Sequence, residues 1–291
     1  MASSNTRRQF LRAALNDVLA DAVPSTEPRA RSRLQPVPGP ARCATADELL
    51  TIAAELALEP HAAAITALAK PSWRLTACDE HDAARSARVW SDLSAGADDA
   101  ETRRSLRLAE LDRATCEIAG LDSPDGLRVC FDGTPVLDGA WPPVRCDVRF
   151  DVARRSSDGT PVAARRELVL PRAWSAPVQR LELTAAEREA WEELRHRLAL
   201  AQGTELAQGD EQALHRLFGY PDERQGLMPE MCEQASAAHI PADRWVLVLQ
   251  VTLEPVPAVP MLHSPRRAYL WADEHAVRDH DLARAAHVII Q

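Results

Sequence analysis

The stretch HRLFGYPDERQG, from His215 to Gly226, concentrates side chains that could do chemistry. A histidine acts as a general base, or activates a nucleophile, when a carboxylate or a thiol lies within hydrogen-bond distance of it. Asp222, Glu223 and Cys232 are the candidate partners nearby in the sequence. Such a set would make the protein a hydrolase or a transferase that uses His215 with Cys232 or with Asp222.

A structural interpretation competes with this one. We expect a helix to end near Phe218, Gly219 to close it in the left-handed conformation, and Pro221 to begin a turn. Polar groups on a surface loop are also well placed to contact another molecule, so ligand or partner contact is the second role that we assign to the stretch. The candidate binding residues are His215, Gly219, Tyr220, Asp222, Arg224, Gln225, Gly226 and Gln250.

Two glutamines lie at the ends of apolar runs later in the chain. Gln250 closes the run WVLVLQ, and Gln291 closes HVIIQ. A buried amide needs hydrogen-bond partners. The two amides therefore either bond each other and a neighbouring loop, or they line a pocket.

The sequence lacks the motifs of common catalytic and cofactor sites. It has no G-x-S-x-G, no H-E-x-x-H and no P-loop, and its 11 glycines do not cluster to cradle phosphates. The six cysteines form no C-x-x-C pair, which favours reduced buried thiols over zinc ligands or disulfides. A metal site formed by His215, Asp222 and His263 is not supported, because the spacing of these residues matches no metal-binding pattern. We predict no cofactor and no metal, and we assign no catalytic residue.

Size and composition are those of an ordinary globular chain. Of its 291 residues, 46% are hydrophobic and 26% are charged. The formal net charge of −9 argues against general binding to nucleic acid, because nucleic-acid binders present a basic face. No apolar run approaches the roughly 20 residues of a membrane span. A protein partner or a small polar ligand is the expectation that remains.

The N-terminal residues contain a possible export motif. TRRQFLRAAL, from Thr6, resembles a twin-arginine signal, but Arg12 and Asp17 interrupt the apolar run that export requires. The apolar residues recur at helical spacing instead, which predicts an amphipathic helix over residues 1–23 and a cytoplasmic protein. Residues 24–44 are rich in proline and arginine and are typical of a linker.

The remaining residues, 45–291, have the pattern of an α+β fold. Capping-box pairs at Thr45–Glu48 and Thr184–Glu187 begin helices, and the first belongs to a helical hairpin that ends near Pro71. Residues 77–104 are expected to be loop, with a short helix as the alternative within it. The predicted strands cover residues 106–111, 126–131, 144–152, 165–171, 245–251, 267–272 and 287–291. We predict an N-terminal helical hairpin plus a strongly bent, mainly antiparallel β-sheet or roll with a packed helix over 185–202.

The C-terminal half resembles the YwqG-like family, a bacterial family of unknown function. Its motif H-x-L-L-G-Y-P-x-x-I-Q-G is followed by a leucine-rich strand that ends in Gln, a strand with Tyr and Trp, and a last strand that ends in Gln. The matching positions are His215, Leu217, Gly219, Tyr220, Pro221, Gln225, Gly226, Trp245, Leu247, Leu249, Gln250, Tyr269, Trp271 and Gln291. Weaker similarity in ALAKPSWRLTA, LRLAEL and DGLRVCFDG extends the resemblance back to about residue 45.

Two loops of the family pattern are missing. RSARVWSDL, at residues 85–93, lacks the family's R-L-G-G-x-P-x-L-P, and PAVPMLHSPRR, at 257–267, replaces its W-G-D-x-G turn. The resemblance therefore implies a divergent member. Because the sequence shows no assembled catalytic set, we expect a non-catalytic binding or accessory protein rather than an enzyme, with neutralisation of a bacterial toxin as one version that depends on family analogy alone.

Limited proteolysis should cut the chain within residues 24–42, because this proline- and arginine-rich stretch lacks a pattern for burial in a core. A stable fragment that starts near residue 45 is expected, and mass spectrometry of the digest would identify it. Resistance of the 24–42 stretch would contradict the linker assignment.

Overall fold

The structure is a computed structural model that describes residues 42–78, 87–90, 105–121, 123, 125–137, 143–152, 159–203, 215–221, 228–254 and 266–291. The chain divides into two compact units, Met1–Arg33 and Leu34–Gln291. The predicted helix over 1–23 and the linker up to residue 41 lie outside the described residues. All that follows concerns the second unit.

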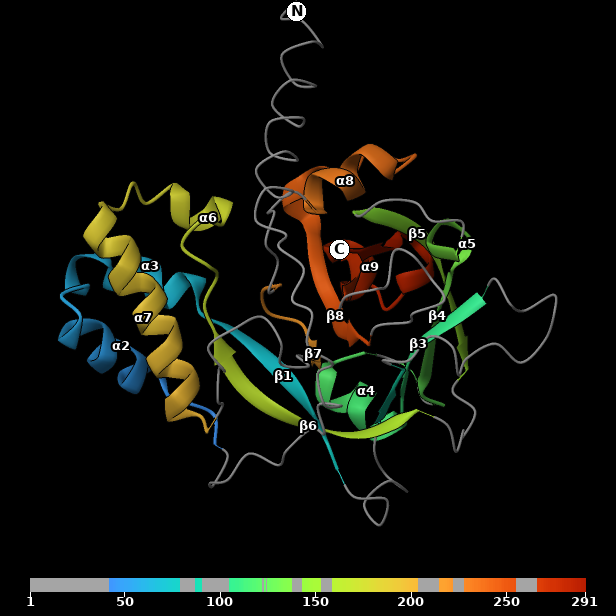
Figure 1. Cartoon of the computed structure of the whole chain (residues 1–291), viewed down its shortest axis with the longest axis horizontal. Coiled ribbons are helices and arrows are strands. Elements are labelled where there is room, and N and C mark those ends of the chain that lie inside the picture. Colours follow the sequence, from blue (N-terminus) through green and yellow to red (C-terminus); the bar gives the residue numbers. More distant parts are fainter. Residues whose placement is uncertain are drawn as a thin grey trace, which may run out of the picture. The chain divides into compact units, whose positions relative to one another are not determined.

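In the described part of the chain, ten strands form a closed antiparallel barrel in the order β1-β6-β2-β3-β4-β5-β10-β9-β8-β7 (Figure 1). The strands are β1 (Lys70–Ala77), β2 (Ala87–Val89), β3 (Ser105–Leu111), β4 (Leu127–Asp132), β5 (Val144–Val152), β6 (Thr160–Val169), β7 (His215–Leu217), β8 (Trp245–Leu253), β9 (Arg266–Asp273) and β10 (Ala286–Ile290). The predicted α+β class and antiparallel pairing are confirmed. The sheet bends further than predicted and closes, because β1 pairs with both β6 and β7.

Alternating side chains fill the barrel with aliphatic residues. Val288 and Ile290 of β10 face this core, whereas Ile289 between them packs on the outer surface. Short helices add further core residues; these helices are α4 (Arg113–Ala119), α5 (Thr134–Leu137), α9 (Glu274–Arg278) and η6 (Leu282–Arg284). The 3-10 helix η4 (Ala242–Arg244) precedes β8 and has no buried residue. Cys116 and Val136 show how α4 and α5 contribute, since both are fully buried in the core cluster. The interior of the barrel is therefore packed by side chains.

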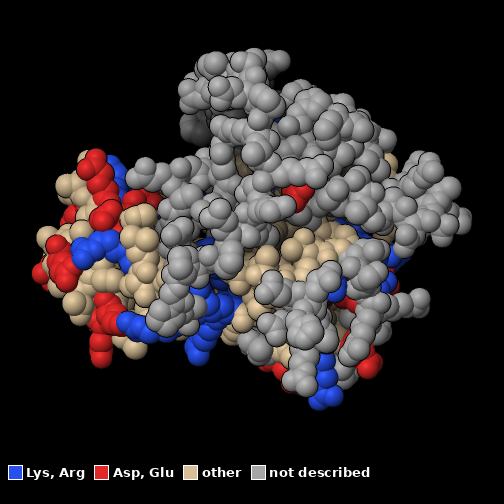
Figure 2. All heavy atoms as spheres, turned by 60° about the horizontal axis from the view of Figure 1, so that its bottom comes forward, with Lys and Arg blue, Asp and Glu red and all other residues tan. Residues whose placement is uncertain are grey.

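A helical layer packs on the far ends of β1 and β6 (Figure 1). Its helices are α2 (Ala46–Glu55), η1 (Glu59–His61), α3 (Ala62–Leu68), α6 (Ala176–Gln179) and α7 (Ala185–Ala201). Both predicted capping boxes are confirmed, at Thr45–Glu48 and Thr184–Glu187. Fully buried Trp191 donates its indole N–H to the carbonyl of Pro171 at 2.8 Å. Acidic side chains gather over this layer (Figure 2).

A third cluster covers the outer surface of β8, β9 and β10 beneath α8 (Met228–Ala235). Trp245 and Leu247 of β8 belong to it. A β-bulge between Leu247 and Leu249 then turns Val248 and Leu249 to the barrel core. The near-continuous apolar sequence of β8 thus reflects burial on both faces, as the sequence pattern predicts.

Two local predictions were wrong. Residues 77–104 were expected to be loop, but Ala87–Val89 form β2. A strand with only two buried apolar residues is too short to show a period of two. A helix was expected to end near Phe218, but His215–Leu217 form β7. Pairing with β1 and β8, which lie far away in the sequence, determines the conformation of this segment.

All six cysteines are free, as the spacing predicts, and four of them are buried. Within the described ranges, no helix is long and apolar enough to cross a membrane.

Candidate functional site

His215, the first residue of β7, makes a hydrogen bond to the main chain. It is buried, and its Nδ1 accepts the main-chain N–H of Thr252 at 3.2 Å. The β7–β8 ladder pairs Arg216 with Gln250 and does not extend to Thr252, so the imidazole satisfies an N–H that the ladder leaves open. Burial lowers the pKa of His215 to about 4, and the imidazole is therefore neutral at pH 7.

Cys232 lies in different surroundings from His215. It packs in the cluster beneath α8 with Trp245 and Tyr269. Burial raises the pKa of its thiol, which disfavours the thiolate that a nucleophile needs. No hydrogen bond joins the two side chains among the described residues, and Asp222, the other candidate partner, lies outside those residues. These surroundings favour the structural interpretation of His215.

The neighbouring residue, Arg216, belongs to a buried ion-pair cluster. Its Nη2 lies 3.2 Å from Oε1 of Glu167, whose Oε2 accepts the Nε–H of Arg74 at 3.1 Å. All three side chains are buried, and they come from three adjacent strands, β7, β6 and β1. Burial lowers the pKa of Arg216 to about 10, opposed by the charge of Glu167.

The backbone turns sharply after β7. Phe218 and Gly219 both have positive φ, at 57° and 80°. Ser72 of β1 donates its hydroxyl to the carbonyls of Leu217 and Phe218, at 3.1 and 3.2 Å. A Cβ on Gly219 would lie 2.7 Å from Cγ2 of Val169 and 2.9 Å from Cβ of Ser72. Glycine is required here both for its conformation and for this close approach, although it follows a strand and not the predicted helix.

Tyr220 makes two contacts with neighbouring residues. Its carbonyl accepts Nη1–H of Arg216 at 3.0 Å. The ammonium of Lys70 lies over its ring, 4.9 Å from the centroid. Burial raises the pKa of the phenol to about 12. The loop is thereby attached to β1 and β7.

The remaining residues singled out from the sequence divide into those that the structure describes and those that it does not. Gln250 is fully buried and lies between Arg216 and Tyr269 in the register of the sheet. Gln291 pairs its backbone with Arg267, while its side-chain Oε1 is buried without a hydrogen-bond partner among the described residues. Asp222, Arg224, Gln225 and Gly226 lie outside the described residues. The structure thus brings together His215, Gly219, Tyr220 and Gln250 along β7 and its neighbours.

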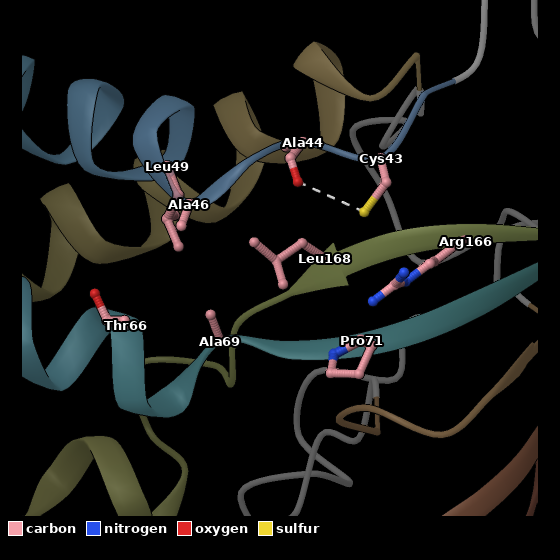
Figure 3. A pocket seen from close by; sticks show the side chains of 9 residues that line it. All are labelled: Cys43, Ala44, Ala46, Leu49, Thr66, Ala69, Pro71, Arg166 and Leu168. Carbon is pink, nitrogen blue, oxygen red and sulfur yellow. Dashed lines mark hydrogen bonds between the residues drawn. The ribbon is translucent and has the colours of Figure 1, made fainter. Parts of the chain in front are cut away.

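A pocket of about 230 Å³ opens where the segment before α2, the end of α3 and the paired strands β1 and β6 meet (Figure 3). Its floor includes buried Ala44 and Leu49. The remaining lining residues are Cys43, Ala46, Thr66, Ala69, Pro71, Arg166 and Leu168. Pro71 and Leu168 are cross-strand partners, so the pocket uses residues of β1 and β6 that alternate with Ser72 and Val169. It therefore lies on the face of the β1–β6 pair opposite to the close contact of Gly219 with Ser72 and Val169.

Gln202, one residue after α7, holds two walls of the pocket together. Its buried Oε1 accepts the N–H of Ala44 at 3.1 Å and the N–H of Leu168 at 2.7 Å. Its Nε2 donates to the carbonyl of Leu168 at 3.0 Å. The amide thereby closes the end of β6 and positions the segment that carries Cys43.

Two polar groups lie at one end of the pocket, the thiol of Cys43 and the guanidinium of Arg166 (Figure 3). Burial raises the pKa of Cys43, and the positive charge of Arg166 opposes that shift. Cys43 also contacts the carbonyl of Ala44 at 3.5 Å. Arg166 is exposed and makes no ion pair or hydrogen bond within the described ranges. Lys and Arg side chains gather in this region, between the helical layer and the barrel (Figure 2).

Sequence reasoning missed this pocket and its polar residues. Arg166 was assigned to a strand, but nothing local distinguishes it from Arg165 beside it. Gln202 precedes Gly203, but a polar residue at the end of a helix does not by itself predict a hydrogen bond to a distant segment. The pairing of these residues with Ala44 and Leu168 spans long stretches of sequence, which a local pattern does not show.

Comparison with known proteins found no family model and no curated protein that matches this chain. The resemblance to the YwqG-like family therefore stays a prediction. Over the described ranges, no three His, Cys, Asp or Glu side chains come together in a group that could hold a metal ion.

Replacement of Gly219 by alanine should destabilise the protein by more than the cost of its conformation alone. Gly120 provides the matched control, because it has φ +70° but nothing within 4 Å of an added Cβ. We expect a loss of about 1–2 kcal/mol for Gly120→Ala and about 1–3 kcal/mol more for Gly219→Ala, from overpacking. Urea denaturation of both variants measures the difference; equal losses would contradict the close packing at Gly219.

Acidification should destabilise the protein through His215. The folded-state pKa of about 4 lies below the ordinary value of 6.5, so the unfolded chain takes up the proton first as the pH falls. Between pH 6.5 and 4, this costs up to roughly 3 kcal/mol of unfolding free energy. His215→Gln should therefore show a shallower decline than the parent protein in urea titrations at each pH. His275→Gln, on the exposed surface of α9, should follow the parent; identical slopes for all three would contradict the assignment.

Proposed function

We propose that the protein is a non-catalytic, cytoplasmic binding module and a divergent relative of the YwqG-like family. Its ligand is a small anionic amphiphile, meaning an acid group on a short hydrocarbon chain. The hydrocarbon enters the pocket between Leu49, Pro71 and Leu168, and Arg166 binds the acid.

One observation carries this proposal: Arg166 lies exposed at an otherwise largely apolar pocket and has no ion pair within the described ranges. A guanidinium presents a planar set of donors that matches a carboxylate or a phosphate. The adjacent Glu167 does not neutralise it, because that carboxylate lies on the opposite face of β6 and contacts Arg74 and Arg216. The guanidinium of Arg166 is therefore available to pair with an anion.

The size of the pocket limits the ligand. Its volume of about 230 Å³ is below the roughly 300–1,000 Å³ of sites that enclose drug-sized molecules. Alanines at positions 44, 46 and 69 leave the space open, and Leu49 and Leu168 supply apolar surface. A short acyl or similar chain fits this lining better than a sugar or a nucleotide, which would need more hydrogen-bond partners.

The turn Phe218–Tyr220 after β7 has a supporting role in this proposal. Its Gly219 packs against Ser72 and Val169, on the face of the paired strands β1 and β6 opposite to Pro71, Arg166 and Leu168. A rigid backing keeps the walls of a small pocket in place and reduces the entropy lost on binding.

Octanoate is the probe that tests the site. The full chain is titrated with the fluorescent apolar anion 8-anilinonaphthalene-1-sulfonate, and octanoate is added as competitor. Arg166→Gln should weaken octanoate binding by about tenfold or more, because a charge-assisted hydrogen bond is lost. Octanol, which has the same chain without the charge, should compete poorly with the dye on the parent protein.

Arg113→Gln is the matched control, since it removes an exposed guanidinium from α4. It should leave octanoate binding unchanged. Equal binding of octanoate by the parent and by Arg166→Gln would overturn the assignment of the pocket. Absence of binding to the parent at millimolar octanoate would overturn the ligand class.

A further inference from the structure

A second hollow, of about 690 Å³, lies along α7 in the helical layer, away from the Arg166 pocket. It is a groove between the loop that precedes α6 and one face of α7. Its lining residues are Ala173, Trp174, Gln179, Arg188, Glu189, Glu192 and Glu193. An aromatic ring and three carboxylates therefore border the same open space.

Trp174 is unusual for its exposure. Its side chain is 42% exposed, and the described residues include only one other large hydrophobic residue in that class, Leu200. The guanidinium of Arg172 already lies over its ring, 4.8 Å from the centroid. The ring thus binds a cation from this chain and still presents surface to the groove. Exposed aromatic residues in concave sites are typical of contacts with a partner.

The carboxylates of the groove differ in their partners. Glu192 accepts the N–H of Ala173 at 2.6 Å and pairs with Arg195, so it belongs to the framework of the groove. Glu189 and Glu193 are exposed, and neither makes an ion pair or a hydrogen bond within the described ranges. They are four residues apart on one helix, where like charges repel. A bound cation would remove that repulsion.

Arg188 also lines the groove and offsets part of its negative charge. Its Nη1 donates to the carbonyl of Leu183 at 2.9 Å, which directs this guanidinium to the end of the helix. Glu189 and Glu193 remain as two available charges beside Trp174. The groove therefore complements a ligand that carries positive charges and some apolar surface.

We propose that this groove binds an extended basic segment of a partner protein, with Arg or Lys at alternate positions. Residues four apart on a helix lie about 6 Å apart. Side chains two apart in an extended peptide lie roughly 6.6 Å apart on the same side. Two cations of such a segment can thus reach Glu189 and Glu193 together, while an aliphatic stem packs on Trp174.

Two synthetic peptides of identical composition test this arrangement. One carries arginines at alternate positions in an alanine background, and the other carries the same arginines next to one another. Fluorescence anisotropy of the labelled peptides with the full chain, at low salt, measures binding. We expect the alternating peptide to bind at least threefold more tightly, and its affinity to fall as salt screens the charges.

Glu189→Gln/Glu193→Gln should weaken the alternating peptide at least tenfold, and Trp174→Ala should weaken it severalfold. The matched control is Glu233→Gln/Asp243→Asn, which removes two exposed acidic groups near α8 and should change binding by less than twofold. Thermal unfolding verifies that the groove variants remain folded. Replacement of two repelling carboxylates by amides should not lower the unfolding temperature.

Three outcomes would overturn the proposal. The first is equal binding of the peptide by the parent protein and by the double glutamine variant. The second is binding of tetramethylammonium as strong as that of the peptide, which would indicate a small-cation site. The third is concentration-dependent dimerisation that Trp174→Ala abolishes without any peptide binding, which would make the groove an interface between copies of the chain.

Discussion

The buried carboxylate of Glu167 holds three strands together where the barrel closes. It lies on β6, and its two oxygens meet Arg74 on β1 and Arg216 on β7. Because a buried charge is strongly unfavourable without a partner, these three strands remain in one register as long as the carboxylate and both guanidinium groups are present. Arg74 and Arg216 are also direct cross-strand partners, so the carboxylate is needed to offset the repulsion between them.

The two faces of the paired strands β1 and β6 have different roles. On one face, Gly219 approaches Ser72 so closely that no side chain fits between them. On the other face, Pro71 and Leu168 form a wall of the pocket that holds Arg166. Gly219, from the motif that first suggested chemistry, therefore packs against β1 and β6 on the face opposite to the pocket, and the residues of the proposed ligand site alternate with those that Gly219 contacts.

The proposed sites have a common physical basis, which is charge left available beside apolar surface. Arg166 presents a cation at the first pocket, whereas Glu189 and Glu193 present anions at the α7 groove. A residue of the same type is used by the framework in each region: Arg74 pairs with Glu167 on the face of β1 and β6 opposite to the pocket, and Glu192 accepts the N–H of Ala173 at the groove. A candidate ligand contact is therefore distinguished from a structural one by whether the charged group has a partner in the described part of the chain, and not by its residue type.

The sequence by itself determined the features that depend on neighbouring residues. Thr184 and Glu187 predict the start of α7, and the alternation over residues 144–152 predicts β5 with its observed bounds. Only the tertiary structure decided that the sheet closes, that His215 begins a strand, and that Arg166 faces a pocket. The reason is distance along the chain: capping and periodicity act within a few residues, whereas the bonds from Glu167 to Arg74 and from His215 to Thr252 join segments 93 and 37 residues apart.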